Sequence, residues 1–369
     1  MYQQAIEEWK KALSLNPRQP EIFNNLGNAY SKLNQHREAI ETWQKILDIT
    51  PDSSEVYFKL GSAYGKLDDL TRAISSWEKC ISLNPNDVEA HFNLGVAQYN
   101  SGNFQKAITY WNTVREKRSE DADICEKIGN AYCGLEDFAE AAKFWNRAIS
   151  YVSDDPQLHH KLGIAYSKLN KTQEAIFRWQ KAIELDSDHF EAHHNLGIAF
   201  YNLQRFDEAL TEWEKSKNLN PTDPDLFFKL GHAYRQKRRL DNAIFNWKKA
   251  IELDPENPDY WFSLGKAYIM TGNVREAVRC CMETLALDGY YDEAWIETGI
   301  VIMMTGSYRG AIRLLKKAVK ISGDLPGIYF LLASAYLHTG NLTEAARNLI
   351  KAVRLDNELL EEYAVLLPE

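Results

Sequence analysis

The chain has 369 residues, with 43 lysines and arginines against 52 aspartates and glutamates, and a formal net charge of −9 at pH 7. This charge argues against nucleic-acid binding through bulk electrostatics. No apolar run is long enough to span a bilayer, so we expect neither a nucleic-acid partner nor membrane insertion.

The first 19 residues have the pattern of one amphipathic helix without a partner. Tyr2, Ala5 and Trp9 recur with helical spacing, and Pro17 follows the helix. We therefore predict that residues 1–19 are the second helix of a truncated repeat. The chain is then expected to be cut from a longer array, or to carry a Met1 added by cloning.

From residue 20 onward, a glycine recurs every 34 residues without insertion or deletion. The positions are Gly27, Gly61, Gly95, Gly129, Gly163, Gly197, Gly231, Gly265 and Gly299, and the next step is Ala333. An alanine follows each by 12 residues, and a tryptophan follows that alanine by four in most cycles. A fixed period of this length is typical of stacked repeats that present a binding surface.

We predict one array of ten units, each with two amphipathic helices, followed by a C-terminal capping tail over residues 360–369. The units are 20–53, 54–87, 88–121, 122–155, 156–189, 190–223, 224–257, 258–291, 292–325 and 326–359. The small residues, such as Gly61 and Ala73, are expected where the two helices of a unit cross. Trp77 and its equivalents are expected to fill the gap between neighbouring units.

The repeated residues resemble the tetratricopeptide repeat family. Residues 261–268 read Trp-Phe-Ser-Leu-Gly-Lys-Ala-Tyr and are followed by Ala277, and Pro255 closes the preceding unit. The family's second-helix aromatic is usually tyrosine or phenylalanine, whereas here it is tryptophan. The resemblance covers essentially the whole chain. It implies an all-α, right-handed superhelical solenoid of antiparallel helix pairs, with the first helices lining the concave side.

No motif for catalysis, a cofactor or a metal is present, and we expect a non-enzymatic protein. His189 and His193 have the i, i+4 spacing of a metal pair, but His193 occupies the position that Trp261 fills in another unit, which favours packing. The five cysteines follow no metal or disulfide spacing. Their pattern suggests the cytoplasm or another reducing compartment.

Ligands of the family usually lie along the first helices, which places the candidate groove there. Reading these helices across the array gives a ladder of asparagine and lysine beside one of phenylalanine and histidine. The candidate groove residues are Asn25, Phe58, Lys59, Phe92, Asn93, Lys127, His160, Lys161, His194, Asn195, Phe228, Lys229, His232 and Phe262. Such side chains suit a peptide or helix that carries apolar and charged groups.

Two further features bear on the partner. Family members that grip the C-terminal tails of the Hsp70 and Hsp90 chaperones use lysines at the positions of Phe58 and Glu89, so we do not expect those tails to bind. A more apolar segment near the C-terminus predicts a secondary docking patch. Its residues are Ile269, Met270, Ile300, Met303 and Met304.

The sequence thus predicts a protein–protein interaction scaffold or adaptor that binds a peptide or helix in the concave groove. One alternative is the regulatory or substrate-selecting array of a larger enzyme such as a glycosyltransferase, whose asparagine ladder this array resembles. Lysines interrupt that ladder here at Lys59, Lys127, Lys161 and Lys229. A second alternative is a self-assembling scaffold, and a homo-oligomer is compatible with the sequence.

Overall fold

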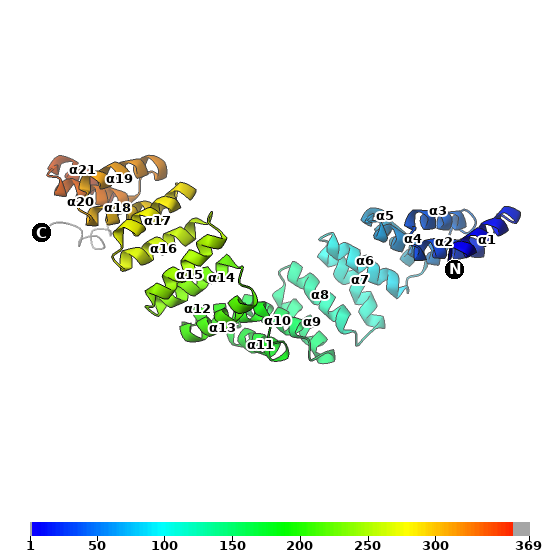
Figure 1. The fold of residues 1–369 in the computed structure, drawn as a ribbon. Helices are drawn as coiled ribbons and strands as arrows, with labels where there is room; N and C mark the ends of the chain where they lie inside the picture. Colours follow the sequence, from blue (N-terminus) through cyan, green and yellow to red (C-terminus); the bar gives the residue numbers. More distant parts are fainter. Residues whose placement is uncertain (1, 357–369) are drawn as a thin grey trace. The chain divides into compact units, whose positions relative to one another are not determined.

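The computed structural model describes residues 2–356, and every regular element within them is an α-helix (Figure 1). The unpaired first helix is α1 (Tyr2–Leu15). Ten pairs follow: α2 (Pro20–Lys32) and α3 (His36–Leu47), α4 (Ser54–Lys66) and α5 (Leu70–Leu83), α6 (Val88–Asn100) and α7 (Phe104–Lys117), α8 (Ala122–Gly134) and α9 (Phe138–Tyr151), α10 (Pro156–Lys168) and α11 (Thr172–Leu185), α12 (Phe190–Asn202) and α13 (Phe206–Leu219), α14 (Pro224–Gln236) and α15 (Leu240–Leu253), α16 (Pro258–Met270) and α17 (Val274–Leu287), α18 (Asp292–Met304) and α19 (Tyr308–Ser322), and α20 (Pro326–His338) and α21 (Leu342–Leu355). The predicted all-α array of helix pairs is confirmed. The predicted tail, 360–369, lies outside the described residues.

Packing divides the chain into two compact units, which we call the N-terminal unit (Met1–Ser187, with α1 to α11) and the C-terminal unit (Asp188–Glu369, from α12 onward). The sequence predicted one array, and the 34-residue period does continue through this division. Within each unit, every helix packs against the helix before it and the helix after it in the chain. The even-numbered helices from α2 to α20 are the first helices of their repeats.

The turn between the two helices of a repeat has the same backbone conformation each time. The residue seven positions after the repeat glycine, or after Ala333, has a positive φ in all ten described pairs. These residues are Asn34, Asp68, Gly102, Glu136, Asn170, Gln204, Arg238, Gly272, Gly306 and Gly340. Glycine and asparagine adopt this left-handed conformation readily, whereas a longer side chain does so at a cost. Arg238 is the middle residue of a basic run, Lys237 to Arg239, that follows α14, so this run belongs to a turn.

Acidic and hydroxyl side chains fix the start of several first helices. The Asp87 carboxylate accepts a hydrogen bond from the backbone N–H of Ala90 at 2.9 Å. Ser53 and Asp121 do the same at α4 and α8. These caps satisfy N–H groups that have no partner within the helix.

The repeat glycine makes room for the tryptophan of its own repeat. A Cβ atom added to Gly129 would lie 2.6 Å from both Cδ1 and Nε1 of Trp145, which is closer than real Cβ contacts allow. The same ring belongs to a buried cluster that includes Leu158 and Leu162 of the next repeat. The prediction that tryptophan packs between neighbouring repeats is thus confirmed. The glycine, however, accommodates this indole ring rather than only a close crossing of two backbones.

Four of the five cysteines, Cys80, Cys125, Cys280 and Cys281, are fully buried, and all five are free thiols. Burial raises the pKa of the Cys80 and Cys280 thiols to about 12. The thiolate, which is the reactive form, is therefore scarce at neutral pH. These four cysteines act as small core residues.

Candidate functional site

The candidate groove residues lie on one set of helices, the first helices, whose exposed surface we call the first-helix face. Phe58, Phe92 and Phe228 are half-buried, and Asn25 is exposed. Phe262 differs, because it is only 9% exposed and belongs to the core cluster around α18 and α20. Its ring centroid lies 4.9 Å from that of Tyr291. The prediction that Phe262 lines the groove is therefore wrong, since the neighbouring repeat covers its ring. The same prediction for His160 is wrong too, because that side chain is also only 9% exposed.

The lysines of the predicted ladder reach back to the preceding repeat. Lys59 Nζ donates a hydrogen bond to Asn24 Oδ1 at 2.7 Å. Lys161 Nζ forms an ion pair with Glu126 at 2.5 Å. Each partner lies 35 residues earlier in the chain, three positions before its own repeat glycine. At these two places the lysine ladder therefore contacts the neighbouring column of side chains in the preceding repeat.

The same offset recurs at Lys127 and Lys229. Lys127 Nζ lies 5.8 Å from the centroid of the Phe92 ring, within reach of a cation–π interaction. Burial lowers the pKa of His194, and the positive charge of Lys229 lowers it further. A partner that pairs with these lysines must therefore replace or share contacts that the free protein already makes.

A cleft of about 490 Å³ opens between α12 and α14 in the C-terminal unit, and we call it the α12–α14 cleft. It brings together three predicted residues, Phe228, Lys229 and His232. The other lining residues are Ile198, Tyr201, Asn202, Trp213 and Asp225. Since most of the lining rings are apolar, while Lys229 and Asp225 contribute charge, the cleft suits a side chain with apolar and polar parts.

His232 is held in place by aromatic rings. Its ring lies 4.4 Å from that of Phe228 and 5.3 Å from that of Trp247, with the rings near perpendicular in both cases. Burial, with a contribution from Arg235, lowers the pKa of His232 to about 4. His232 is therefore neutral at pH 7, and it offers one donor and one acceptor nitrogen rather than a charge.

A second cleft, of about 440 Å³, lies between α2 and α4 in the N-terminal unit, and we call it the α2–α4 cleft. It contains two predicted residues, Phe58 and Lys59. The remaining lining residues are Asn28, Ser31, Lys32, Asn34, His36, Trp43, Ser62, Ala63 and Lys66. The two clefts lie at equivalent places in the repeat but differ in chemistry. Ser31 and Ser62 of the α2–α4 cleft stand where the α12–α14 cleft has Tyr201 and His232, and Lys32 stands where it has Asn202.

Several lining residues escaped the sequence analysis. Tyr201 and Asn202, and likewise Ser31 and Lys32, follow the repeat glycine by four and five positions. These residues lie in the last turn of their helix, one turn after the predicted groove positions. They share a face with those positions, because residues three and four apart lie on the same side of a helix. The residues four and five positions after each repeat glycine are therefore the sequence signal for this part of the clefts.

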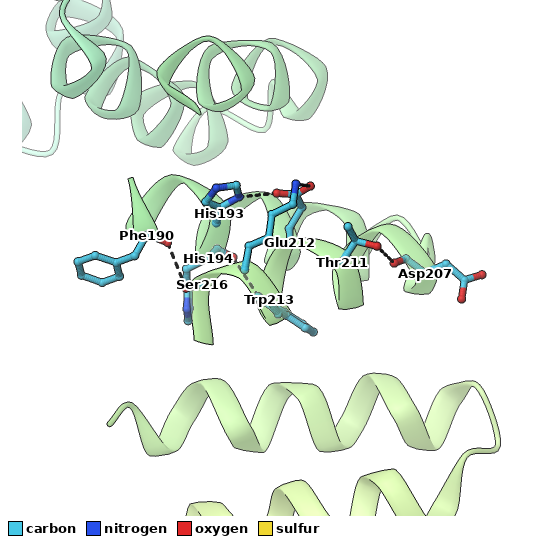
Figure 2. A network of polar contacts seen from close by, with 9 residues as sticks. Phe190, His193, His194, Asp207, Thr211, Glu212, Trp213 and Ser216 are labelled. Carbon is cyan, nitrogen blue, oxygen red and sulfur yellow. Dashed lines mark hydrogen bonds and ion pairs between the residues drawn. The ribbon is translucent and has the colours of Figure 1, made fainter. Parts of the chain in front are cut away.

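The buried His193 of α12 contacts a carboxylate of α13. Figure 2 shows His193 pointing toward Glu212 of α13, and the Nδ1–Oε2 distance is 2.5 Å. Burial alone would raise the pKa of Glu212, but hydrogen bonds from His193 and Lys215 outweigh it and hold that pKa below its usual value. Within residues 2–356, no group of three or more histidine, cysteine, aspartate or glutamate side chains could hold a metal ion.

The secondary apolar patch is only partly at the surface. Met270 and Met304 are 59% and 64% exposed. Met303 is 8% exposed and belongs to the core cluster of the last repeats. Ile269 and Ile300 are half-buried and pack against core clusters. The prediction that Met303 lines a docking surface is wrong, because its side chain faces the core of its own unit.

The acidic residues near the start of the first helices also connect repeats. Asp225 accepts a hydrogen bond from the Tyr260 hydroxyl at 2.8 Å. Asp259 accepts one from the Tyr291 hydroxyl at 2.7 Å. In both pairs the tyrosine belongs to or directly precedes the next first helix. These carboxylates therefore stabilise the stacking of repeats.

None of the helices described between residues 2 and 356 combines the length and the apolar character that a membrane span requires.

Family models match most of the chain. A model described as TPR repeat matches residues 1–34, 27–68, 66–102, 129–170, 166–204, 199–237 and 231–272. Models described as Tetratricopeptide repeat match residues 303–366 and 88–121. No curated protein matches the chain.

Among solved structures, the C-terminal part of a TPR repeat-containing protein from Cytophaga hutchinsonii is 19% identical, with a TM-score of 0.59 over 65% of this chain and 99% of that one. YrrB, described as a TPR protein with an unusual peptide-binding site, is 25% identical, with a TM-score of 0.44 over 50% of this chain and 94% of that one. MamA from Desulfovibrio magneticus RS-1 is 24% identical, with a TM-score of 0.44 over 46% of this chain and 97% of that one. The first of these likenesses shows the fold alone.

Proposed function

Since the chain belongs to the tetratricopeptide repeat family, whose repeats serve as protein-interaction scaffolds, we propose that it binds a peptide or helix of a partner protein along its first-helix face. The observation that carries this proposal is the α12–α14 cleft. Three residues that the repeat pattern selected, Phe228, Lys229 and His232, line this one cavity.

The chemistry of the cleft supports a peptide ligand. Its volume of about 490 Å³ lies in the range of small-ligand pockets, which is also enough for a large side chain. Phe228 and Tyr201 offer apolar contact. Lys229 lies 3.6 Å from the Asp225 carboxylate and offers a cation that a ligand carboxylate would share with it. The neutral His232 can donate to or accept from a peptide group. A ligand residue that combines an apolar part with an acidic or amide end fits these groups.

The proposal is tested by affinity capture from the native lysate with a double variant, Phe228→Ala with Lys229→Gln. The matched control is Phe245→Ala with Lys249→Gln on α15, where the Phe245 side chain is 58% exposed. We expect a partner that the wild type and the control capture equally, and that the cleft variant loses at least about tenfold, the effect of removing a contact worth 1.4 kcal/mol. Circular dichroism must show that both variants remain folded.

Equal capture by the cleft variant would place binding elsewhere and contradict the proposal. Light scattering at several protein concentrations separates the self-assembling alternative, since a scaffold that docks into its own copies gains mass with concentration.

A further inference from the structure

In the last three repeats, the two sets of helices carry opposite charge. The second helices of these repeats are α17, α19 and α21 (Figure 1), and together they carry ten lysines and arginines against three glutamates. The first helices, α16, α18 and α20, carry one lysine against four aspartates and glutamates. We call the exposed surface of α17, α19 and α21 the second-helix face. This face is basic although the net charge of the chain is −9.

The basic character is strongest on α19. Every exposed residue of this helix is a lysine or arginine, and the helix contains no aspartate or glutamate. Each of the other second helices from α3 to α21 contains at least one acidic residue. The exposed residues recur every three or four positions along three helical turns, so they lie on one side of the helix. They are Arg309, Arg313, Lys316, Lys317 and Lys320.

No carboxylate within residues 2–356 forms an ion pair with these five side chains of α19. Lys316 Nζ lies 5.6 Å from the centroid of the Tyr336 ring, and Lys317 Nζ lies 5.9 Å from that of Trp295. An aromatic ring attracts a cation but carries no net charge that would neutralise it. The positive charge of α19 is therefore available to an anionic partner.

The neighbouring second helices extend this charge. Arg279, Arg313 and Arg347 are exposed and occupy the same position in the last three repeats, two residues before the position of the repeat tryptophan. Arg279 and Arg347 each pair with a glutamate of their own helix, at 2.9 Å and 2.7 Å. Such exposed pairs are weak and exchange readily with other charges. Since equivalent residues of stacked repeats follow one another in space, the three guanidinium groups form a row across the second-helix face.

Apolar side chains are exposed within the same face. Met282 and Ile350 are 43% and 54% exposed, and they occupy on α17 and α21 the position that Lys316 has on α19. None of the described residues of α17, α19 and α21 is an exposed aromatic, the kind of side chain on which nucleic-acid bases stack. The clefts that suit a peptide lie on the first-helix face. A basic face with apolar side chains among its charges fits an anionic lipid surface.

We propose that the second-helix face of the last three repeats docks on an anionic lipid bilayer. Its ammonium and guanidinium groups contact the headgroup phosphates, and Met282 and Ile350 reach the boundary of the acyl chains. The helices do not insert, because their apolar sides are buried in the core of the repeats. The acidic first helices are repelled by the same bilayer, so the first-helix face points away from the lipid and stays accessible to a partner.

Sedimentation of the full chain with lipid vesicles tests this proposal. The probes are vesicles of phosphatidylcholine alone and vesicles of phosphatidylcholine with phosphatidylglycerol in a three-to-one ratio. We expect the chain to bind the anionic vesicles only. Binding should be lost in concentrated salt, because the Debye length falls to about 3 Å at 1 M.

A lysine variant locates the binding face. Lys316→Gln with Lys317→Gln and Lys320→Gln should weaken binding to the anionic vesicles about a hundredfold, since each basic residue near such a surface contributes about fivefold. The matched control removes the same charge from exposed lysines of α5, α7 and α9 and should bind like the wild type. Its changes are Lys79→Gln, Lys106→Gln and Lys143→Gln. Circular dichroism must show that both variants remain folded.

An apolar variant separates a bilayer from other polyanions. Met282→Gln with Ile350→Gln should weaken vesicle binding severalfold, because both side chains lose their contact with the acyl boundary. An unchanged affinity of this variant for the vesicles would contradict the lipid assignment, since a purely electrostatic partner does not need these side chains.

The proposal is overturned if the wild type does not bind anionic vesicles, or if the lysine variant binds them as tightly as its control. It is also overturned if a DNA duplex or a capped hexaglutamate peptide binds in a manner that depends on the α19 lysines while the vesicles do not bind. Vesicle binding requires no partner protein, so its failure leaves the proposed function of the first-helix face untouched.

Discussion

Gly129 and Trp145 are matched in size, because the indole ring occupies the space where any Cβ on Gly129 would lie. A Cβ added there would be 2.6 Å from two atoms of that ring. The ring is 2% exposed and is fixed by a hydrogen bond to Asn130, so it has little freedom to move aside. The spacing of 16 residues between glycine and tryptophan recurs through the array and explains why both are repeated together.

The first prediction is that Gly129→Ala destabilises the protein by about 1–3 kcal/mol, the usual effect of overpacking a core. The free energy of unfolding in urea measures this. The double variant Gly129→Ala with Trp145→Leu should lose less unfolding free energy than the sum of the two single variants. The coupling energy should be about 0.5–3 kcal/mol. The chain contains a natural precedent in its last repeat, where Ala333 and Leu349 occupy the two positions.

Gly265 is the matched control, since its partner position holds Cys281 instead of tryptophan. An added Cβ there would lie 3.1 Å from Cys281 Sγ, a contact that a small shift relieves. Gly265→Ala should therefore destabilise by less than about half of the Gly129→Ala effect. Equal losses at the two sites would show that the indole ring is not the reason for glycine.

The second prediction concerns the turn between α8 and α9. Glu136 is exposed and has a φ of 60°. Glu136→Gly should stabilise the protein by about 0.5–1 kcal/mol, because glycine removes the strain of a left-handed side-chain-bearing residue. The urea midpoint should rise accordingly. Asn170→Gly, at the same turn position, should change it by only a few tenths, since asparagine tolerates this conformation. A lower midpoint for Glu136→Gly would contradict the argument.

The third prediction separates two neighbouring methionines. Met303→Glu should lower the free energy of unfolding by more than about 3 kcal/mol, because it places an unpaired carboxylate in the core. Met304→Glu should change it by less than about 0.5 kcal/mol, since that side chain is 64% exposed. Circular dichroism during urea titration measures both. If Met304→Glu also reduces partner capture, the exposed part of the apolar patch is a docking site.

The fourth prediction is a pH dependence centred on His232. Its pKa is about 4 in the folded chain and about 6.5 when unfolded, because burial disfavours the charged ring. Between these values the unfolded state binds more protons, so the free energy of unfolding falls as the pH drops from 6.5 to 4. This single residue contributes a loss of up to about 3 kcal/mol across that window. Arg235 adds to the effect and Asp259 opposes it.

The measurement compares urea denaturation of the wild type and His232→Gln from pH 4 to pH 8. The unfolding free energy of the variant minus that of the wild type should be constant above pH 6.5. This difference should increase as the pH falls below 6.5. A difference independent of pH would mean that His232 is not buried as a neutral ring. A ligand carboxylate bound beside it in the α12–α14 cleft should reduce the effect, because a negative charge favours the protonated ring.

The sequence alone determined the fold, because every residue that defines the repeat acts over a short and constant spacing. Gly129 and Trp145 meet within one helical hairpin, and Asp87 caps the helix that directly follows it. Such contacts depend on local geometry, which the period of 34 residues repeats. The same spacing also located part of the proposed binding surface, since Phe58, Phe228 and His232 all line clefts between first helices.

Only the tertiary structure decided which members of each ladder are available to a partner. Phe262 and Met303 have the pattern of surface residues, yet neighbouring repeats cover them. Lys59 and Lys161 find their partners 35 residues away, and the Trp43 indole lacks the acceptor that Trp247 has. These differences arise from side-chain contacts across repeats and from small changes in hydrogen-bond geometry. A repeat pattern assigns equivalent residues to equivalent positions. It therefore does not predict differences between one repeat and the next.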